Sequence, residues 1–360
     1  MPNYLYNLAT DKHKGLKASL IKFFLFLLSL IYGLVIRLLI FVSGFRAYKA
    51  PIKVISVGNI TWGGTGKTPL VELIAGYLKS KGKKAAIISR GYKRKTIRYP
   101  LARRPWFGLL WPKPLSAIRF EFIGDEAYML REKMKDIPVI VDANRRRGIE
   151  SAVKEYAVDT VILDDGFQQW KIKKDLEIVV IDAGNPFGNR NMIPRGILRQ
   201  PLAALKQADI FILTKTNLAS DFEKTKIYLT VINPLALIAE SIHEAKGAYE
   251  LNKNNQFLSL DSLKGKTVVL FSGIGDPDSF EKLIAHFGIN IGLSLRFSDH
   301  YAYSQKDIEN IILKSKNKGI DILITTEKDA ARLCGLMPAL CGVRILVLPI
   351  SLKITKNEER

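Results

Sequence analysis

VGNITWGGTGKTP (residues 57–69) follows the apolar run at 52–57 and precedes a stretch of helical length at 69–79. A glycine-rich loop between a strand and a helix, ending in Lys67 and Thr68, has the form of a phosphate-binding P-loop. Thr61 stands where that motif usually has its first glycine, but the half that carries the chemistry, GGTGKT (63–68), is intact. The sequence therefore predicts a nucleoside triphosphate site, and the alternative is a structural turn without a ligand.

The loop assigns a role to each of its residues. Backbone N–H groups of a glycine-rich loop can converge on phosphate oxygens, because glycine permits the required φ values. Lys67 would reach the β- and γ-phosphates, and the Thr68 hydroxyl would bind Mg²⁺. The segment TKTN (214–217) lacks the aspartate of a guanine-binding motif, which favours ATP over GTP. The predicted ATP-binding residues are Thr61, Trp62, Gly63, Gly64, Thr65, Gly66, Lys67 and Thr68.

Two adjacent carboxylates provide the remaining predicted ligands of the metal. The apolar run 160–163 ends in Asp164 and Asp165. Strand ends of a parallel sheet meet at one edge, so this pair is expected beside the P-loop. Carboxylate oxygens are ligands that Mg²⁺ prefers. Thr68, Asp164 and Asp165 are therefore the predicted metal ligands, unless the two aspartates only cap a turn.

Short apolar runs alternate with helical stretches over most of the chain, which predicts a doubly wound α/β fold with a mostly parallel sheet. A polar stretch at 246–256 separates two such series. The expected division is an N-terminal segment (1–48), a P-loop domain (49–245) and a smaller α/β domain (246–360) that closes over the active site. The turn SGIGDP (272–277) lacks the third glycine of a dinucleotide fingerprint and predicts a tight strand-to-helix connection. The apolar runs are 52–57, 85–88, 139–141, 160–163, 178–181, 210–213, 267–271, 322–325 and 345–348, and the helical stretches are 69–79, 145–156, 279–286 and 304–316.

The N-terminal region is apolar on every side of a helix from residue 20 to 45, interrupted only by Lys22 and Arg37. A membrane span needs about 20 mainly apolar residues. The segment is expected to be a retained membrane helix that spans the bilayer or lies in its interface. A cleaved signal peptide and a buried helix are the alternatives.

The charge balance favours anionic partners. The 360 residues carry 55 Lys and Arg against 34 Asp and Glu, a formal charge of +21. Such an excess suits acidic lipid or a phosphorylated substrate. No nucleic-acid-binding motif accompanies it, so nucleic acid is not an expected partner. The predicted partners are ATP and a membrane surface.

Several longer stretches appear in a fixed order along the chain. They are VGNITWGGTGKTP (57–69), SRGY (89–92), GDEA (124–127), LDDGFQQW (163–170), KDLEIVVIDAGNPFGN (174–189), IPRGILRQP (193–201), FSDH (297–300) and TTEKDA (325–330). Together they resemble the tetraacyldisaccharide 4'-kinases of lipid A biosynthesis. The resemblance covers nearly the whole chain.

The resemblance implies a reaction, a substrate and a location. Members of that family use ATP and Mg²⁺ to phosphorylate the 4'-hydroxyl of a tetraacylated glucosamine disaccharide 1-phosphate. They do so at the cytoplasmic face of the bacterial inner membrane. A monomer is expected. The competing hypothesis is a membrane-associated P-loop ATPase switch without a sugar acceptor.

The resemblance also implies site residues outside the P-loop. Asp125 and His300 would activate the acceptor hydroxyl and, with Lys67, are the predicted catalytic residues. Asp125 could instead cap the helix that starts near it, and His300 could be a surface residue. Relatives carry Glu where this chain has Gln200, which would weaken metal binding if that Glu assists the metal. The predicted substrate-binding residues are Arg90, Asn189, Arg195 and Arg199.

The segment 98–120 is rich in Arg, Trp and Leu. We expect it to contact lipid, with Trp106 and Trp111 at the level of the head groups. Arg103, Arg104 and Lys113 would then contact phosphates. A packed helical hairpin is the alternative.

Overall fold

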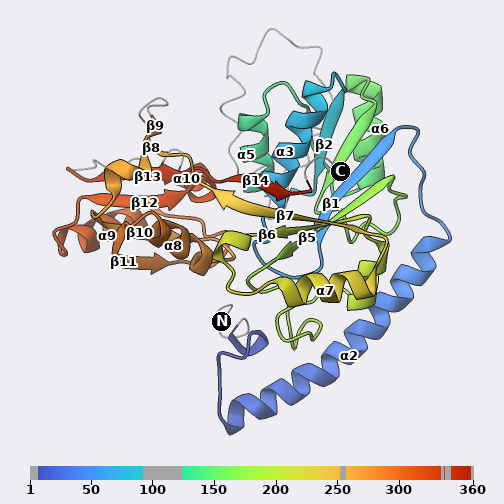
Figure 1. Cartoon of the computed structure of the whole chain (residues 1–360), viewed down its shortest axis with the longest axis horizontal. Coiled ribbons are helices and arrows are strands. Elements are labelled where there is room, and N and C mark those ends of the chain that lie inside the picture. The colour runs from blue at the N-terminus through green and yellow to red at the C-terminus, as the bar shows by residue number, and fades with distance from the viewer. Residues whose placement is uncertain (1–6, 92–123, 252–256, 334–335, 337–341, 358–360) are drawn as a thin grey trace.

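The computed structural model describes residues 7–91, 124–251, 257–333, 336 and 342–357. Within these residues the strands form two sheets, and helices cover both faces of each (Figure 1). The segment 98–120, with the predicted lipid contacts of Trp106, Trp111, Arg103, Arg104 and Lys113, lies outside the described residues.

The first sheet has the strand order β14-β7-β6-β5-β1-β4-β2-β3. Its strand pairs are parallel except for β14 against β7. The strands are β1 (Lys53–Asn59), β2 (Ala85–Ser89), β3 (Val139–Val141), β4 (Thr160–Asp164), β5 (Leu176–Asp182), β6 (Ile210–Thr214), β7 (Leu237–Glu244) and β14 (Ser351–Lys356).

Helices pack on both faces of this sheet because its strands are apolar on both faces. Alternate residues of β5 point to opposite faces, so Ile178 and Val180 pack with α3 while Val179 and Ile181 pack with α7. A doubly wound sheet follows, which confirms the predicted fold class. The elements between the strands are α3 (Lys67–Ser80), α5 (Asp125–Lys133), α6 (Arg145–Tyr156), α7 (Glu223–Ile232) and the 3-10 turns η2 (Leu202–Gln207) and η3 (Thr216–Leu218).

The second sheet has the order β11-β10-β12-β13-β8-β9 and its own two cores. Phe280 of α8 packs on one face, and Ile308 of α9 packs on the other. The elements are β8 (Ala248–Glu250), β9 (Phe257–Leu258), η4 (Leu260–Leu263), β10 (Thr267–Ser272), α8 (Pro277–His286), β11 (Asn290–Arg296), α9 (Gln305–Lys316), β12 (Ile322–Thr326), α10 (Glu327–Leu333) and β13 (Arg344–Leu348). We call the first sheet with its helices the first unit, and the second sheet with its helices the second unit.

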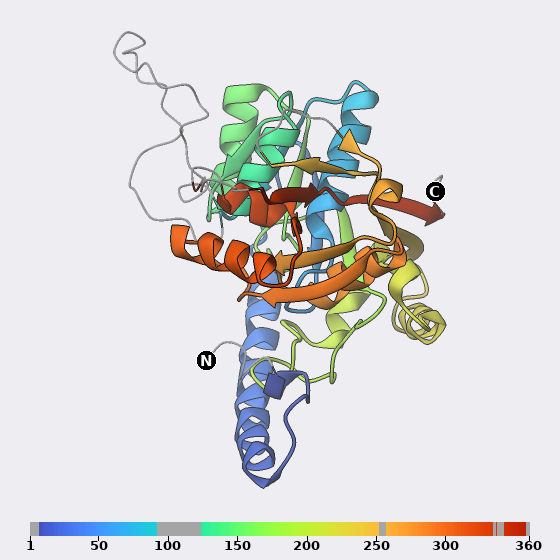
Figure 2. The same cartoon turned by 90° about the vertical axis from the view of Figure 1, so that its left-hand side faces the viewer.

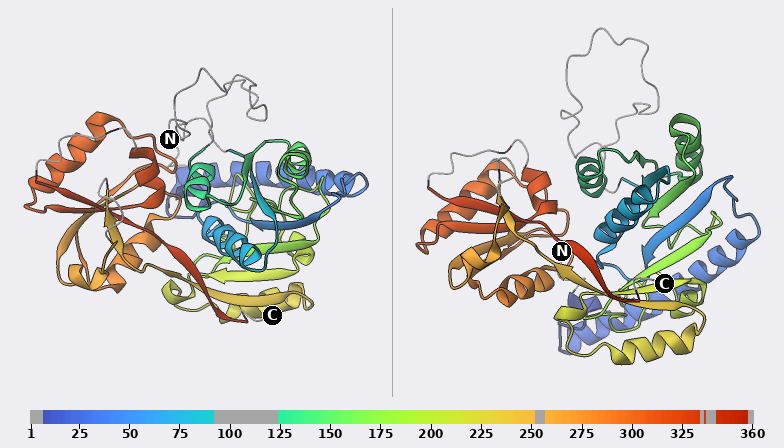
Figure 3. Two further views of the ribbon diagram at one scale, coloured as in Figure 1. Left: turned by 90° about the horizontal axis from the view of Figure 1, so that it is seen from above. Right: turned by 45° about the horizontal axis from the view of Figure 1, so that its top comes forward.

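The end of the chain differs from the predicted division. After β13 the chain returns to the first unit, where β14 pairs with β7 (Figure 3). A continuous domain over 246–360 is therefore wrong for its last strand. The short run around Leu352 and Ile354 carried too little periodicity to reveal this pairing, although both side chains pack in the first unit.

The N-terminal apolar segment forms one helix, α2 (Leu16–Gly44), of 29 residues. Figure 2 shows it extending beyond the two units. Most of its large apolar side chains are exposed, and only 17% of its most apolar stretch is buried. The side that packs on the first unit carries small residues such as Ser29 and Gly33. By length and composition this helix can cross a membrane.

Candidate active site

The glycine-rich loop adopts a conformation that needs glycine at two positions. Gly63 has φ of 122° and Gly66 has φ of 87°, which are values that residues with a Cβ rarely adopt. Gly66 directly precedes α3, so the loop lies over the N-terminus of that helix. Thr214 Oγ1 donates to the Thr65 carbonyl at 2.8 Å. The end of β6 thus fixes the loop, and its glycine-rich part lies at the N-terminus of α3, where backbone amides can bind phosphate.

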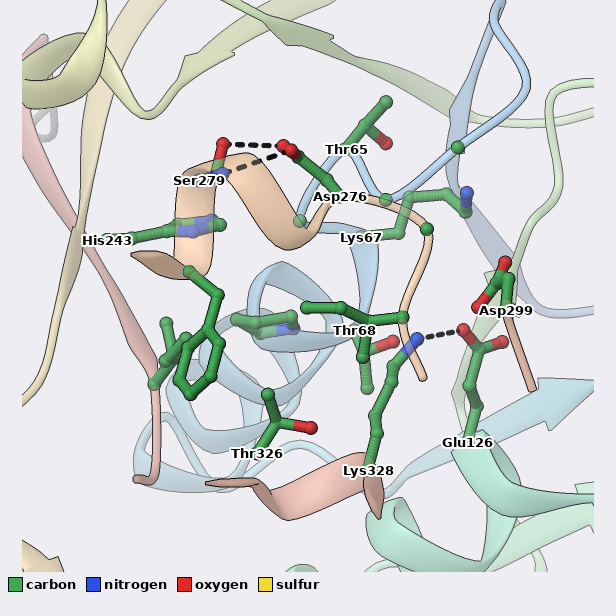
Figure 4. Close-up of a pocket in the computed structure, with 18 of the residues that line it drawn as sticks. Thr65, Lys67, Thr68, Glu126, His243, Asp276, Ser279, Asp299, Thr326 and Lys328 are labelled. Carbon is green, nitrogen blue, oxygen red and sulfur yellow. Dashed lines mark hydrogen bonds and ion pairs between the residues drawn. The ribbon is translucent and has the colours of Figure 1, made fainter. Parts of the chain in front are cut away.

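A cavity of about 550 Å³ lies between the two units and is lined by the whole loop from Thr61 to Thr68. We call the part formed by residues 61–68 with Asp164 and Asp165 the phosphate end. Asp125 and His300 form the dyad; His300 lines the cavity, Asp125 is buried behind it, and the part of the cavity beside His300 is the dyad end. Residues from both units surround the cavity (Figure 4).

Lys67 of the phosphate end is held by two oxygens of the first unit. Its Nζ donates to Asn59 Oδ1 at 3.1 Å and lies 3.6 Å from Asp165 Oδ1. Asp165 also accepts from Arg199, at 2.8 Å and 3.0 Å. Burial alone would raise the pKa of Asp165, but Lys67 and Arg199 hold it well below its ordinary value.

Asp164 has a different environment from its neighbour. Its side chain is buried and accepts a hydrogen bond from Ser89 Oγ at 3.0 Å. Burial raises its pKa to about 6, and the negative charges of Glu126 and Asp165 add to this effect. A buried carboxylate of this kind gains from a cation beside it.

Thr68 and Asp164 are the residues that fit a magnesium ion. Both line the cavity, and they offer the hard oxygen atoms that Mg²⁺ prefers. The described residues contain no group of three His, Cys, Asp or Glu side chains placed to bind a metal. Mg²⁺ bound with a nucleotide does not need such a group, because water and phosphate oxygens complete its coordination. Asp165, the third predicted ligand, already has Lys67 and Arg199 as cationic partners.

The dyad joins residues that are 175 positions apart in the sequence. His300 Nδ1 lies 2.7 Å from Asp125 Oδ2, with Asp125 on α5 of the first unit and His300 in the loop after β11. His300 has φ of 57°, and its N–H donates to the Gly273 carbonyl at 3.0 Å. Burial raises the pKa of Asp125, but His300 and Arg332 lower it by more, so that it lies well below its ordinary value. Asp125 is the first residue of α5, and its Oδ1 also accepts a hydrogen bond from the Glu126 N–H at 3.0 Å.

Ion pairs tie the two units together around the cavity. Lys215, buried at the end of β6, contacts both Asp182 of the first unit and Asp276 of the second, and donates to the Gly64 carbonyl at 2.9 Å. Lys328 of α10 pairs with Glu126 of α5 across the cavity (Figure 4). The turn after β10 packs so closely that a Cβ on Gly275 would lie 3.1 Å from the Gly64 nitrogen. The predicted tight turn after β10 is therefore present, and it touches the phosphate loop.

Comparisons with known proteins agree on one family. Residues 21–360 match the family model of the tetraacyldisaccharide-1-P 4'-kinases. The chain belongs to this family. It is 34% identical to the tetraacyldisaccharide 4'-kinase of Halothermothrix orenii over 92% of this chain and 88% of that one. It is 33% identical to the enzyme of Elusimicrobium minutum over 94% and 89%. The structure of LpxK from Aquifex aeolicus in complex with ATP matches with a TM-score of 0.67 and 28% identity, covering 94% of this chain and 96% of that one.

Membership of the tetraacyldisaccharide 4'-kinase family confirms the predicted family and the predicted function as a kinase of lipid A biosynthesis. The structure of this chain shows where the predicted site residues lie. All the predicted ATP-binding residues line the cavity, and so do Asp164, Asp165 and His300. Trp62 is half exposed there, and its N–H donates to the Ile197 carbonyl at 2.7 Å.

The predicted substrate residues of this family member divide into two pairs. Arg90 and Arg199 line the cavity. Asn189 and Arg195 instead hold the N-terminal segment, since Asn189 donates to the Ala9 carbonyl at 2.9 Å and Arg195 pairs with Asp11 at 2.9 Å. The contacts of Asn189 and Arg195 therefore give no support to a role in substrate binding, which stays a prediction.

Within the described part of the chain, Gln200 of this kinase does not line the cavity that the predicted metal ligands line. It is fully buried, and its Oε1 accepts from Trp170 Nε1 at 3.1 Å. In this structure, then, Gln200 contacts an indole group.

The residues at the site of this kinase that were not predicted include Glu126, Lys215, Lys328 and Arg332. Lys215 lies in TKTN, a segment whose pattern relates only to base recognition, and Lys328 lies in TTEKDA, which carries only the family resemblance. Arg332 follows that signature by two residues. Their charges act between units, and a sequence pattern does not reveal a partner in another unit.

Proposed function

We propose that this chain transfers the γ-phosphate of ATP to the 4'-hydroxyl of a tetraacylated glucosamine disaccharide 1-phosphate. The observation that carries this proposal is the cavity, which is lined by a phosphate loop and by His300, the half of the Asp125–His300 dyad that faces it. A phosphate loop alone would fit any nucleotide-binding protein. A dyad that can take up a proton next to it suits a hydroxyl acceptor.

At the phosphate end the loop amides and Lys67 would bind the β- and γ-phosphates. Thr68 and Asp164 would hold Mg²⁺, which supplies positive charge that stabilises the charge developing on the transferred phosphoryl group. Asn59 and Asp165, which Arg199 also contacts, keep the Lys67 ammonium in position.

At the dyad end Asp125 would orient the imidazole and His300 would accept the proton. Asp125 Oδ2 already receives hydrogen bonds from Arg332 and is paired with His300 Nδ1, so its low pKa makes it a weak base. His300 Nε2, which lies 3.7 Å from Asp299 Oδ2 at the cavity, would then be the ring atom that takes the proton. As the sugar oxygen bonds to the γ-phosphorus, the bond to the β-phosphate oxygen breaks, ADP leaves and the sugar proton passes to Nε2.

The rest of the cavity suits the base of the nucleotide. Its lining includes apolar side chains from η3, from the turn after β10, from α8 and from the end of β13, namely Leu218, Ile274, Phe280, Leu283, Leu348 and Ile350. Binding pockets for planar ligands are lined mainly by such side chains.

We further propose that the chain acts as a monomer at the cytoplasmic face of the bacterial inner membrane, with α2 as its anchor. The length and apolar surface of α2 support this location, and so does the excess of basic residues for anionic lipid. A protease added to spheroplasts should leave the second unit intact and should degrade it only after lysis. Degradation in intact spheroplasts would contradict the proposed side.

One assay tests the proposed reaction. Purified full-length chain is incubated with γ-labelled ATP, Mg²⁺ and the acylated disaccharide 1-phosphate in detergent. We expect label in the lipid, loss of transfer when EDTA removes the metal, and recovery when Mg²⁺ is restored. Label that appears only as inorganic phosphate would instead support an ATPase switch and would refute the proposed acceptor.

A further inference from the structure

Arg332 on α10 is a buried cation whose contacts reach both halves of the dyad. Its side chain is 2% exposed. Nε donates to Asp125 Oδ2 at 3.0 Å, and Nη2 contacts the same oxygen. Nη2 also lies 3.5 Å from His300 Nδ1. The guanidinium thus meets the carboxylate at the oxygen that faces the imidazole.

The same guanidinium holds the loop that carries His300. Nη1 donates to the Gly273 carbonyl at 2.7 Å, and this carbonyl also accepts the His300 backbone N–H. Asp125 belongs to the first unit, while Gly273, His300 and Arg332 belong to the second. Arg332 therefore links the two units at the point where the dyad forms.

Arg332 is itself kept in place by a buried carboxylate. Asp329 is fully buried and accepts from Arg332 Nη1 at 3.1 Å. It also accepts from the Gly273 N–H at 2.9 Å and from the Tyr303 hydroxyl at 3.0 Å. A guanidinium fixed in this way presents its donors in one orientation, which a flexible ammonium does not.

We propose that Arg332 is a positioning residue for phosphoryl transfer, which fixes the Asp125 carboxylate against His300 and joins the dyad across the two units. The inference rests on the proposed function. Neither Arg332 nor Asp125 is among the residues that line the cavity in the described part of the chain, so Arg332 acts through Asp125 on His300, which does line it. Without the guanidinium, the buried carboxylate of Asp125 would lose the cation that contacts it directly. The imidazole of His300 would then no longer be held in one orientation.

The test is steady-state kinetics on full-length Arg332→Gln and Arg332→Lys. For Arg332→Gln we expect kcat to fall about 10²-fold, as for other residues that orient a catalytic group, with the KM for ATP changed less than about threefold. Arg332→Lys keeps the charge but loses the fixed fork, so an intermediate loss is expected. The matched control is Arg344→Gln, which removes a partly exposed arginine that pairs with Glu250 in the same unit and should leave kcat unchanged.

A double variant separates positioning from a general structural effect. If Arg332 acts through Asp125, adding Arg332→Gln to Asp125→Asn should cost less than about threefold more, because the group it orients is already gone. A structural defect would cost the same factor in both backgrounds. That result would overturn the proposal, and so would Arg332→Gln or Arg332→Lys with wild-type kcat.

Folding is checked by thermal unfolding of each variant. Should Arg332→Gln not fold, Arg332→Lys alone and in the Asp125→Asn background gives the same comparison. The wild-type chain must label the lipid disaccharide in the same assay. Absence of label there would refute the proposed function, whereas the Arg332 proposal fails when the wild type labels the lipid and the variants match it.

Discussion

The phosphate end of the cavity comes from one unit and mostly from adjacent residues, whereas the dyad end joins residues 125 and 300 from two units. The phosphate end needs only β1, the glycine-rich loop and α3 to form, with β4 supplying Asp164 and Asp165. The dyad exists only while α5 of the first unit contacts α10 and the His300 loop of the second. Changes at the phosphate end should therefore affect nucleotide use as a whole, and changes at the dyad end should affect the transfer step.

The largest effect is expected for Lys67→Ala. Loss of the ammonium that stabilises phosphate charge should lower kcat/KM for ATP about 10³-fold. Lys79→Ala, at the exposed end of the same helix, removes only a pair with Asp136 and should be nearly neutral. If a folded Lys67→Ala chain keeps a kcat/KM within about tenfold of wild type, the phosphate end does not depend on Lys67 as proposed.

Asp125→Asn tests the dyad end. The amide keeps the shape but cannot hold the imidazole as a carboxylate does, so kcat should fall about 10²- to 10³-fold. The KM for ATP should change less than about threefold, because Asp125 is not one of the residues proposed to bind the phosphates. Asp136→Asn is the exposed control. A change confined to the KM for ATP would mean that the dyad end serves nucleotide binding instead.

Asp276→Asn tests the contact between the phosphate end and the second unit. Asn can still cap α8, where Asp276 accepts the Ser279 N–H, but the charge that pairs with Lys215 is lost. We expect the KM for ATP to rise about three- to tenfold with a smaller change in kcat. Asp278→Asn, two residues further along, removes a more exposed pair with Arg296 and should have little effect. Equal effects of both variants would contradict a specific contact through Lys215.

The smallest effect concerns stability at the phosphate end. Burial raises the pKa of Asp164 to about 6. A raised pKa means that the protonated carboxyl contributes stability below about pH 4, and this contribution is lost as pH rises through about 6. Asp164→Asn imitates the neutral form. Without nucleotide or metal, the variant should therefore be more stable than wild type at pH 8 by about 1–3 kcal/mol, with no difference near pH 4.

Chemical denaturation in EDTA at both pH values measures this difference. Asp159→Asn at the other end of β4 is the control, because the hydrogen bond from Thr160 lowers the pKa of Asp159 and the expected pH dependence has the opposite sign. If Asp164→Asn is less stable than wild type at pH 8, the ionised Asp164 carboxylate does not destabilise the folded protein, which contradicts the prediction.

The sequence predicted those parts of the molecule that depend on neighbouring residues. Buried parallel strands are apolar on both faces, so their runs are visible, and β3 (Val139–Val141) and α6 (Arg145–Tyr156) have the predicted bounds. The loop at 63–68 was predictable because the required φ values restrict it to glycine at Gly63 and Gly66. Asp125 and His300 were found only through the family resemblance, since no spacing links them.

The remaining features depend on contacts between distant segments. Arg332 and Lys215 are ordinary basic residues in sequence, and their roles at the site come from carboxylates of the other unit. The pairing of β14 with β7 was missed for the same reason, because an edge strand with alternate exposed residues resembles a polar tail. Asn189 and Arg195 belong to a family motif, yet their partners are in the N-terminal segment.

The return of β14 has a mechanical consequence. The chain passes between the units twice, at residues 245–247 and again at 349–350, and the two crossings leave from strands that are hydrogen-bonded to each other (Figure 3). A unit joined by two neighbouring segments can rotate about the line through both connections. Two connections restrain the other rotations, which a single connection would allow. The backbone connection therefore restrains twisting of the second unit more than swinging about this line, and this restraint does not depend on a ligand.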